Sequence, residues 1–148
     1  LAGGRYQGNP STVSDARITA GVIAAPWVGG NYDGNDFFAF GPNNDGLDRV
    51  HVPIISFFGT NDESTLASFI LPAMTKLSGP TYVIELVDQP HIFEQGSWED
   101  RDNWELLFFS AYLKHDPAAL EILRTASSMQ GGNTDVQLFD YQKVPAGN

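Results

Sequence analysis

Hydrophobic residues gather in three short runs along this chain, and each run is typical of a buried strand. The runs cover residues 18–25, 52–58 and 81–87, and β-branched residues recur in all three. An almost continuous apolar run of this length suits a strand that is covered on both faces of a parallel sheet. The pattern therefore predicts three strands at these positions.

Helical spacing of apolar residues follows the second and the third predicted strand. It predicts a helix over residues 64–78 and another over residues 99–114, with Asp62 or Ser64 available to cap the first. Pro117 suits the first turn of a third helix that reaches about Thr125. Strands that alternate with helices indicate an α/β fold, with a mostly parallel sheet and helices on both of its faces. Apolar residues on the two stripes are Leu66, Phe69, Ile70, Ala73, Met74 and Leu77, then Trp104, Leu107, Phe108, Ala111 and Tyr112.

The remaining segments are polar and rich in residues that break regular structure. Residues 1–17 are expected to be a helix end followed by a loop, because glycines and a proline interrupt them. Residues 27–49 are expected to be a long loop, which is more often functional than idle in a compact domain. Aromatic side chains within this loop are expected to pack it against the rest of the domain. They are Tyr32, Phe37, Phe38 and Phe40. The tail from residue 131 is polar, with one apolar patch at residues 136–141.

Composition narrows the possible functions. The chain has 148 residues, and 8 Lys+Arg against 18 Asp+Glu give a net charge of −10. That balance argues against a nucleic-acid partner or an anionic membrane surface, since both need clustered positive charge. No apolar run approaches about 18 residues, so no membrane span is expected. The absence of cysteine excludes disulfides, a thiolate nucleophile and Cys-ligated metals within this chain.

Three chemically interesting residues follow the predicted strands. Trp27 comes after the first strand, Asp62 after the second and His91 after the third. Ligands bind just beyond the carboxyl ends of the strands in open parallel sheets. A carboxylate next to a histidine can fix the imidazole tautomer and stabilise the imidazolium, as general-base catalysis requires. Asp62 and His91 are therefore the candidate catalytic residues.

Each candidate also has a simpler interpretation. Asp62 could serve only to cap the following helix, and Glu63 is an alternative acid one residue further on. His91 could be an ordinary loop histidine. His51 precedes a strand and is expected at the opposite edge of the sheet, and His115 is expected at a helix C-terminus, where a cation is favourable.

Several segments resemble the α/β-hydrolase family. Residues 52–62 (VPIISFFGTND) resemble the strand that ends in Gly-x-x-Asp and supplies the triad acid, and residues 83–93 (VIELVDQPHIF) resemble the next strand with its histidine loop. Pro26-Trp27 is similar to the dipeptide of dienelactone-hydrolase-like and polyester-hydrolase-like members, and residues 99–114 resemble the closing helix. The resemblance covers roughly residues 15–115.

The resemblance implies a serine hydrolase that acts on carboxylic esters without a cofactor. Asp62 would hold His91, His91 would be the general base, and Trp27 would pack against the substrate. Phe93 is expected to wall the same cleft. The substrate would be a small-molecule or polymeric ester.

One motif of that family is missing. Its nucleophile lies on a Gly-x-Ser-x-Gly turn between a strand and a helix, and this chain has no such pentapeptide. We therefore expect residues 1–148 to be the C-terminal portion of one α/β-hydrolase domain, with the N-terminal half as a partner in a second chain. The alternative hypothesis is a non-catalytic or degenerate half-domain that acts in binding or assembly.

Two stretches offer the oxygen ligands that calcium prefers. They are residues 33–36 (DGND) and residues 43–48 (NNDGLD). The complete calcium-loop pattern is absent, and Asn, Asp and Gly are also ordinary turn formers. The sequence therefore predicts no metal, with calcium as the lesser alternative.

Overall fold

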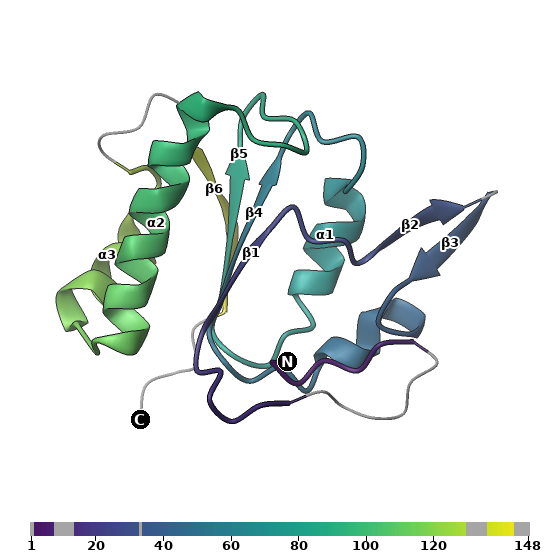
Figure 1. Cartoon of the computed structure of the whole chain (residues 1–148), viewed down its shortest axis with the longest axis horizontal. Helices are drawn as coiled ribbons and strands as arrows, with labels where there is room; N and C mark the ends of the chain where they lie inside the picture. The colour runs from purple at the N-terminus through teal and green to yellow at the C-terminus, as the bar shows by residue number, and fades with distance from the viewer. Residues whose placement is uncertain (1, 8–13, 33, 130–135, 144–148) are drawn as a thin grey trace.

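The computed structural model describes residues 2–7, 14–32, 34–129 and 136–143 of the chain, and Figure 1 shows their arrangement. In chain order the elements are β1 (Gly21–Ala24), β2 (Gly29–Tyr32), β3 (Asn35–Phe38), the 3-10 helix η1 (Pro42–Leu47), β4 (Ile54–Gly59), α1 (Ala67–Met74), β5 (Thr81–Leu86), α2 (Gln95–Leu113), α3 (Pro117–Thr125) and β6 (Val136–Lys143).

The main sheet has four strands in the order β1-β4-β5-β6. The first three strands are parallel, with Gly21 opposite Ile54 and Ile54 opposite Thr81. They are the three strands that the apolar runs predict, so the prediction of an α/β chain with a parallel sheet is confirmed. β6 pairs with β5 in the antiparallel direction, and the sequence reasoning noted only an apolar patch there.

Side chains of β4 alternate between the two faces of the sheet. Ile54 and Phe58 belong to the hydrophobic cluster that includes α1, whereas Ile55 and Phe57 belong to the cluster that includes α2 and α3. This period of two is what a strand buried on both faces requires. Figure 1 shows α1 on one side of the sheet and α2 with α3 on the other. The prediction of helices on both faces is therefore confirmed.

β1 lies at an edge of this sheet. Within the described ranges it pairs with β4 alone. All six residues of β4 are buried, whereas none of the four residues of β1 is. The outer edge of β1 thus presents backbone hydrogen-bonding groups to a further strand.

The N-terminal segment differs from expectation. Ala2 forms an isolated antiparallel bridge with Ser14, and the Arg5 amide donates a hydrogen bond to the Gly46 carbonyl. Gly3 has a φ of +110°, which is incompatible with a right-handed helix. The predicted helix end is therefore wrong for residues 2–4, while residue 1 lies outside the described part.

The segment 27–49 is more regular than predicted. It contains the hairpin of β2 and β3, followed by η1. Gly34 in the connection has a φ of +78°, and an Asp-Gly pair between short strands is a hairpin signal that the prediction of a loop overlooked. The expected aromatic packing is present in three ring contacts: Trp27–Phe37, Phe38–Phe69 and Tyr6–Phe40. The Tyr32 side chain lies outside the described part.

Helix positions follow the prediction, with shifted boundaries. α1 begins at Ala67 rather than residue 64, because the chain just before it forms a turn around Asp62. α2 begins at Gln95, four residues early. α3 spans the predicted range, and the Asp116 side chain caps it by accepting from the amides of Ala118 and Ala119. In the described part of the chain, no helix has the length and apolarity needed to cross a membrane.

Candidate functional site

Asp62 and His91 meet at the carboxyl edge of the parallel sheet. Asp62 follows β4 by three residues and His91 follows β5 by five. The Asp62 Oδ2 atom lies 2.9 Å from the His91 Nδ1 atom, which is a hydrogen-bonding distance. The predicted proximity of these two side chains is therefore present in the structure.

Backbone contacts between the two loops hold this arrangement. A Cβ atom added to Gly59, the last residue of β4, would lie 2.0 Å from the carbonyl oxygen of Gln89, so only glycine allows the loops to approach so closely. The Asn61 amide donates to that same carbonyl at 3.0 Å. The Asp88 amide donates to Thr60 Oγ1 at 2.7 Å. The positions of Asp62 and His91 are thus fixed by the loops that carry them.

The Asp62 carboxylate is buried and fully engaged. Its side chain is 0% exposed, and its Oδ1 atom accepts from the amides of Ser64 and Thr65 at 2.8 Å each. Oδ2 accepts from the Thr65 hydroxyl as well as from His91. Burial raises the pKa of this carboxyl, but the hydrogen bonds from Thr65, His91 and Ser64 outweigh it, so the net pKa lies below the usual value. Asp62 is therefore ionised at neutral pH.

The two ring nitrogens of His91 have different roles in the pair with Asp62. Its side chain is 46% exposed. Because an ionised carboxylate only accepts hydrogen bonds, Nδ1 carries the proton in the pair with Asp62, and a neutral His91 has its lone pair on Nε2. This is the tautomer that a general base needs if it is to take a proton at Nε2.

A hollow of about 430 Å³ lies beside His91. Its lining includes Phe93, which is 7% exposed, and Trp98, whose indole N–H donates to the Phe93 carbonyl at 2.9 Å. Arg101 also lines it and is ion-paired with Asp102 at 2.9 Å and Glu105 at 3.2 Å. The hollow is thus mostly apolar, and its guanidinium is already compensated by two carboxylates.

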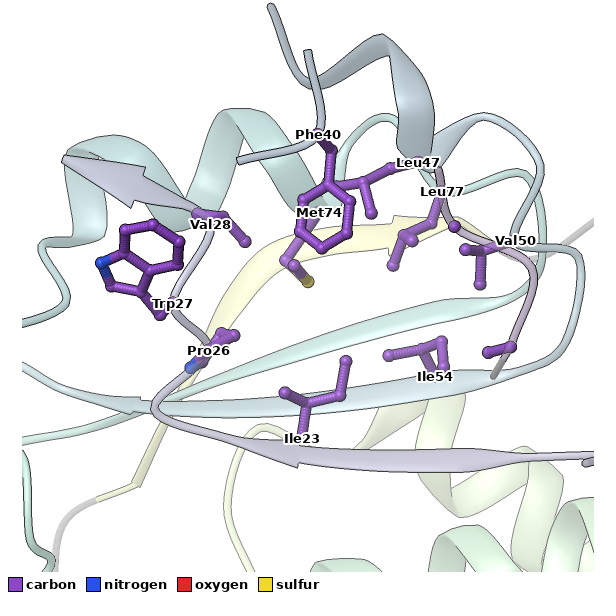
Figure 2. A pocket seen from close by; sticks show the side chains of 12 residues that line it. Ile23, Pro26, Trp27, Val28, Phe40, Leu47, Val50, Ile54, Met74 and Leu77 are labelled. Carbon is purple, nitrogen blue, oxygen red and sulfur yellow. The ribbon is translucent and has the colours of Figure 1, made fainter. Parts of the chain in front are cut away.

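Trp27 lies at the carboxyl end of β1 but outside this hollow. It is 43% exposed and stacks on Phe37, with ring centroids 5.8 Å apart and an interplanar angle of 30°. It lines a separate apolar pocket on the α1 side of the sheet, which Figure 2 shows. Of the four predicted site residues, the structure groups Asp62, His91 and Phe93, and it places Trp27 in this second pocket.

The alternative candidates are positioned differently. Glu63 is exposed, and the hydrogen bond to His91 comes from Asp62. His51 is exposed and precedes the amino end of β4, at the opposite edge of the sheet, as expected. His115 is exposed directly after the C-cap of α2.

Sequence reasoning missed two residues that support the pair, namely Thr65 and Gln89, and it noted Gly59 only as part of the Gly-x-x-Asp motif. A glycine at the end of a buried strand, three residues before the acid, signals a close approach of backbone. The spacing Asp62-x-x-Thr65 signals a local hydrogen-bonded turn. The role of Gln89 had no local signal, because its contact with Gly59 depends on the pairing of β4 and β5.

Among the described residues, no group of three or more His, Asp or Glu side chains is arranged to hold a metal ion. Residues 43–47 belong to η1, Asp48 is its C-cap, and the Lys76 ammonium lies 3.3 Å from Asp45 Oδ1. A cation at that position disfavours a calcium ion beside Asp45. Asp33, in the other candidate stretch, lies outside the described residues.

No model of a known protein family matches this chain, and a search of curated proteins found no significant match.

Proposed function

We propose that this chain is the acid- and base-bearing portion of a carboxylic ester hydrolase of the α/β-hydrolase kind. The observation that carries the proposal is the 2.9 Å contact between a buried Asp62 and a half-exposed His91 at the carboxyl edge of a parallel sheet. A buried, hydrogen-bonded carboxylate that orients an accessible imidazole is the acid–base half of a Ser-His-Asp triad.

In the proposed reaction, a serine hydroxyl attacks the ester carbonyl while His91 Nε2 takes the hydroxyl proton. The imidazolium, stabilised by Asp62, then gives that proton to the departing alcohol oxygen, and an acyl-enzyme remains. Water, activated by His91 in the same way, releases the carboxylic acid and restores the serine. No metal or cofactor takes part in these steps.

The serine would come from a segment outside these 148 residues. The sequence has no Gly-x-Ser-x-Gly turn, and among the described residues only β4 pairs with β1, so that the outer edge of β1 can accept a further strand. A strand paired there would end beside the hollow that His91 lines, because the carboxyl ends of parallel strands share one edge. The same segment would supply the amides that stabilise the tetrahedral intermediate.

The electrostatics of the hollow favour an uncharged substrate. Arg101 is the one permanently charged residue in the described lining, and two carboxylates compensate it. A neutral ester therefore fits this hollow better than an anionic substrate does.

Substitution of His91 tests the proposal in the native protein that contains this chain. We expect His91→Ala to lower kcat for 4-nitrophenyl acetate by at least about 10³-fold, because the serine loses its base. His51→Ala, which changes an exposed histidine at the opposite edge of the sheet, is the matched control and should keep full activity. Near-full activity of His91→Ala would overturn the proposal.

A non-catalytic role in binding or assembly is the second candidate, and the missing serine motif favours it. The two candidates differ in whether the native protein reacts covalently with a fluorophosphonate. A hydrolase becomes labelled on a serine, whereas a binding half-domain does not.

A further inference from the structure

An elongated apolar pocket lies between the main sheet and the elements that cover its α1 face. Its volume is about 300 Å³, and the described residues that line it are all apolar or glycine. Figure 2 shows Trp27 at one end, Ile23 on β1 along the floor, and Met74 with Phe40 above it. Ile54 and Val50 lie at the far end. The pocket therefore runs along the strands from their carboxyl ends toward their amino ends.

The lining defines the chemistry of the occupant. Most of the pocket surface is apolar, so a polar or charged ligand would lose hydration there and find few hydrogen-bond partners. An apolar cavity of about 150 Å³ holds one benzene molecule, so this pocket has room for roughly twice that volume. A medium-length aliphatic chain is an apolar group that matches this lining and this volume.

Consecutive residues after β1 line the hollow beside His91 and the carboxyl end of the pocket. Ala25 lines the hollow beside His91, and the next residue, Pro26, lines the pocket. The chain turns sharply between the two spaces, because Ala25 has a φ of 44°, which is uncommon for a residue with a side chain. Trp27 then stands half-exposed at the end of the pocket, stacked on Phe37.

We propose that this pocket binds the linear aliphatic chain of the substrate, which passes Trp27 and leaves the ester group beside His91. The assignment of the chain to a substrate rests on the proposed function, whereas the binding of an aliphatic chain rests on the pocket alone. The substrate class is thus an uncharged ester with a medium-length aliphatic group.

Gly4 offers a way to fill the pocket. A Cβ atom added to Gly4 would lie 3.6 Å from the Phe40 ring, 3.7 Å from Leu47 Cδ2 and 3.7 Å from Val50 Cγ2, which are ordinary van der Waals contacts with side chains of the lining. A larger side chain at this position would project among the lining residues. Gly96, on α2, has no atom within 4 Å of an added Cβ and gives the matched control.

The test is a calorimetric titration of the native protein containing this chain with 1-butanol, 1-hexanol and 1-decanol. We expect affinity to rise about fourfold for each added methylene group, as burial of about 0.8 kcal/mol per methylene predicts. Gly4→Leu should weaken decanol binding at least about tenfold and butanol binding much less, while Gly96→Leu should bind like the wild type. Trp27→Ala, at a half-exposed position, should also lower the affinity for decanol more than that for butanol.

Three results would overturn the proposal: an affinity that does not depend on chain length, a Gly4→Leu variant that folds and binds decanol like the wild type, or a native protein that binds no decanol because a polypeptide segment fills the pocket. The titration needs no turnover, so it separates the two proposals. The His91→Ala variant should bind decanol with unchanged affinity. If the protein binds decanol but has no His91-dependent esterase activity, the proposal of an aliphatic-chain pocket stands and the proposal of a hydrolase is refuted.

Discussion

Asp62 holds a turn of its own loop and also faces His91. Its Oδ1 atom accepts from the amides of Ser64 and Thr65, and its Oδ2 atom faces His91 Nδ1. A carboxylate can do both because it has two oxygens and about four lone-pair directions. The predicted capping of α1 by Asp62 or Ser64 is wrong, because the N-cap of α1 is Leu66 and no side chain caps it. The turn instead holds the Asp62 side chain rigid and so helps to position the imidazole.

The lowered pKa of Asp62 predicts a specific dependence of stability on pH. The folded pKa lies below the usual value of 3.8, so the unfolded chain binds the proton more readily. The stabilisation by the ionised carboxylate is therefore complete above about pH 5, and it disappears as the pH falls through the lower folded pKa. Asp62→Asn should be less stable at neutral pH and should lose less of its remaining stability on acidification.

Urea unfolding of the wild type and of Asp62→Asn between pH 7 and pH 2 measures this effect. Glu63→Gln removes the exposed carboxyl next to Asp62 and is the matched control, which should follow the wild-type curve. Parallel pH curves for wild type and Asp62→Asn would contradict the assignment of the lowered pKa to this carboxyl.

The helices and strands show which sequence signals are sufficient to predict a regular element. Three parallel strands could be predicted because each is a short apolar run bounded by polar residues, and α3 could be predicted from Pro117 and its acidic cap. The start of α1 could not, because hydrogen bonds to Asp62 hold the preceding residues in a turn. The hairpin of β2 and β3 carried an Asp-Gly signal, but its strands are only four residues long and rich in glycine and asparagine.

The junction between β4 and the His91 loop predicts the effect of one small substitution. In Gly59→Ala the new Cβ would lie 2.0 Å from the Gln89 oxygen and 2.6 Å from its carbonyl carbon, and backbone atoms cannot move aside cheaply. We expect a loss of at least about 2 kcal/mol in the free energy of unfolding. Because the loops must separate, esterase activity should fall as well.

Gly96→Ala provides the comparison in a denaturant titration of both variants. An alanine on α2 meets no atom within 4 Å and should stabilise the helix by about 0.5–1 kcal/mol. A Gly59→Ala variant that is as stable as Gly96→Ala would show that the close approach of the two loops is not required.

At the scale of the whole molecule, the parallel topology explains how much of the site could be predicted. Asp62 and His91 are 29 residues apart, yet two adjacent parallel strands end at the same edge, so their meeting followed from the strand order. The apolar pocket could not be predicted in this way. Its lining comes from segments far apart in the sequence, such as those that carry Gly4, Ile23, Phe40 and Met74. No local pattern in one of these segments indicates that it meets the others.

The open edge of β1 and the missing serine motif lead to the same expectation for the complete molecule. A segment that pairs with β1 would extend the parallel sheet and bring its carboxyl end next to His91. We propose that this chain supplies an acid and a base to a serine that it does not itself contain.

Fluorophosphonate labelling of the native protein, followed by mass-spectrometric location of the label, tests that claim most directly. The account predicts a single labelled serine outside residues 1–148, with labelling lost in His91→Ala and retained in His51→Ala. A label on a residue within this chain, labelling that does not depend on His91, or no labelling at all would contradict it.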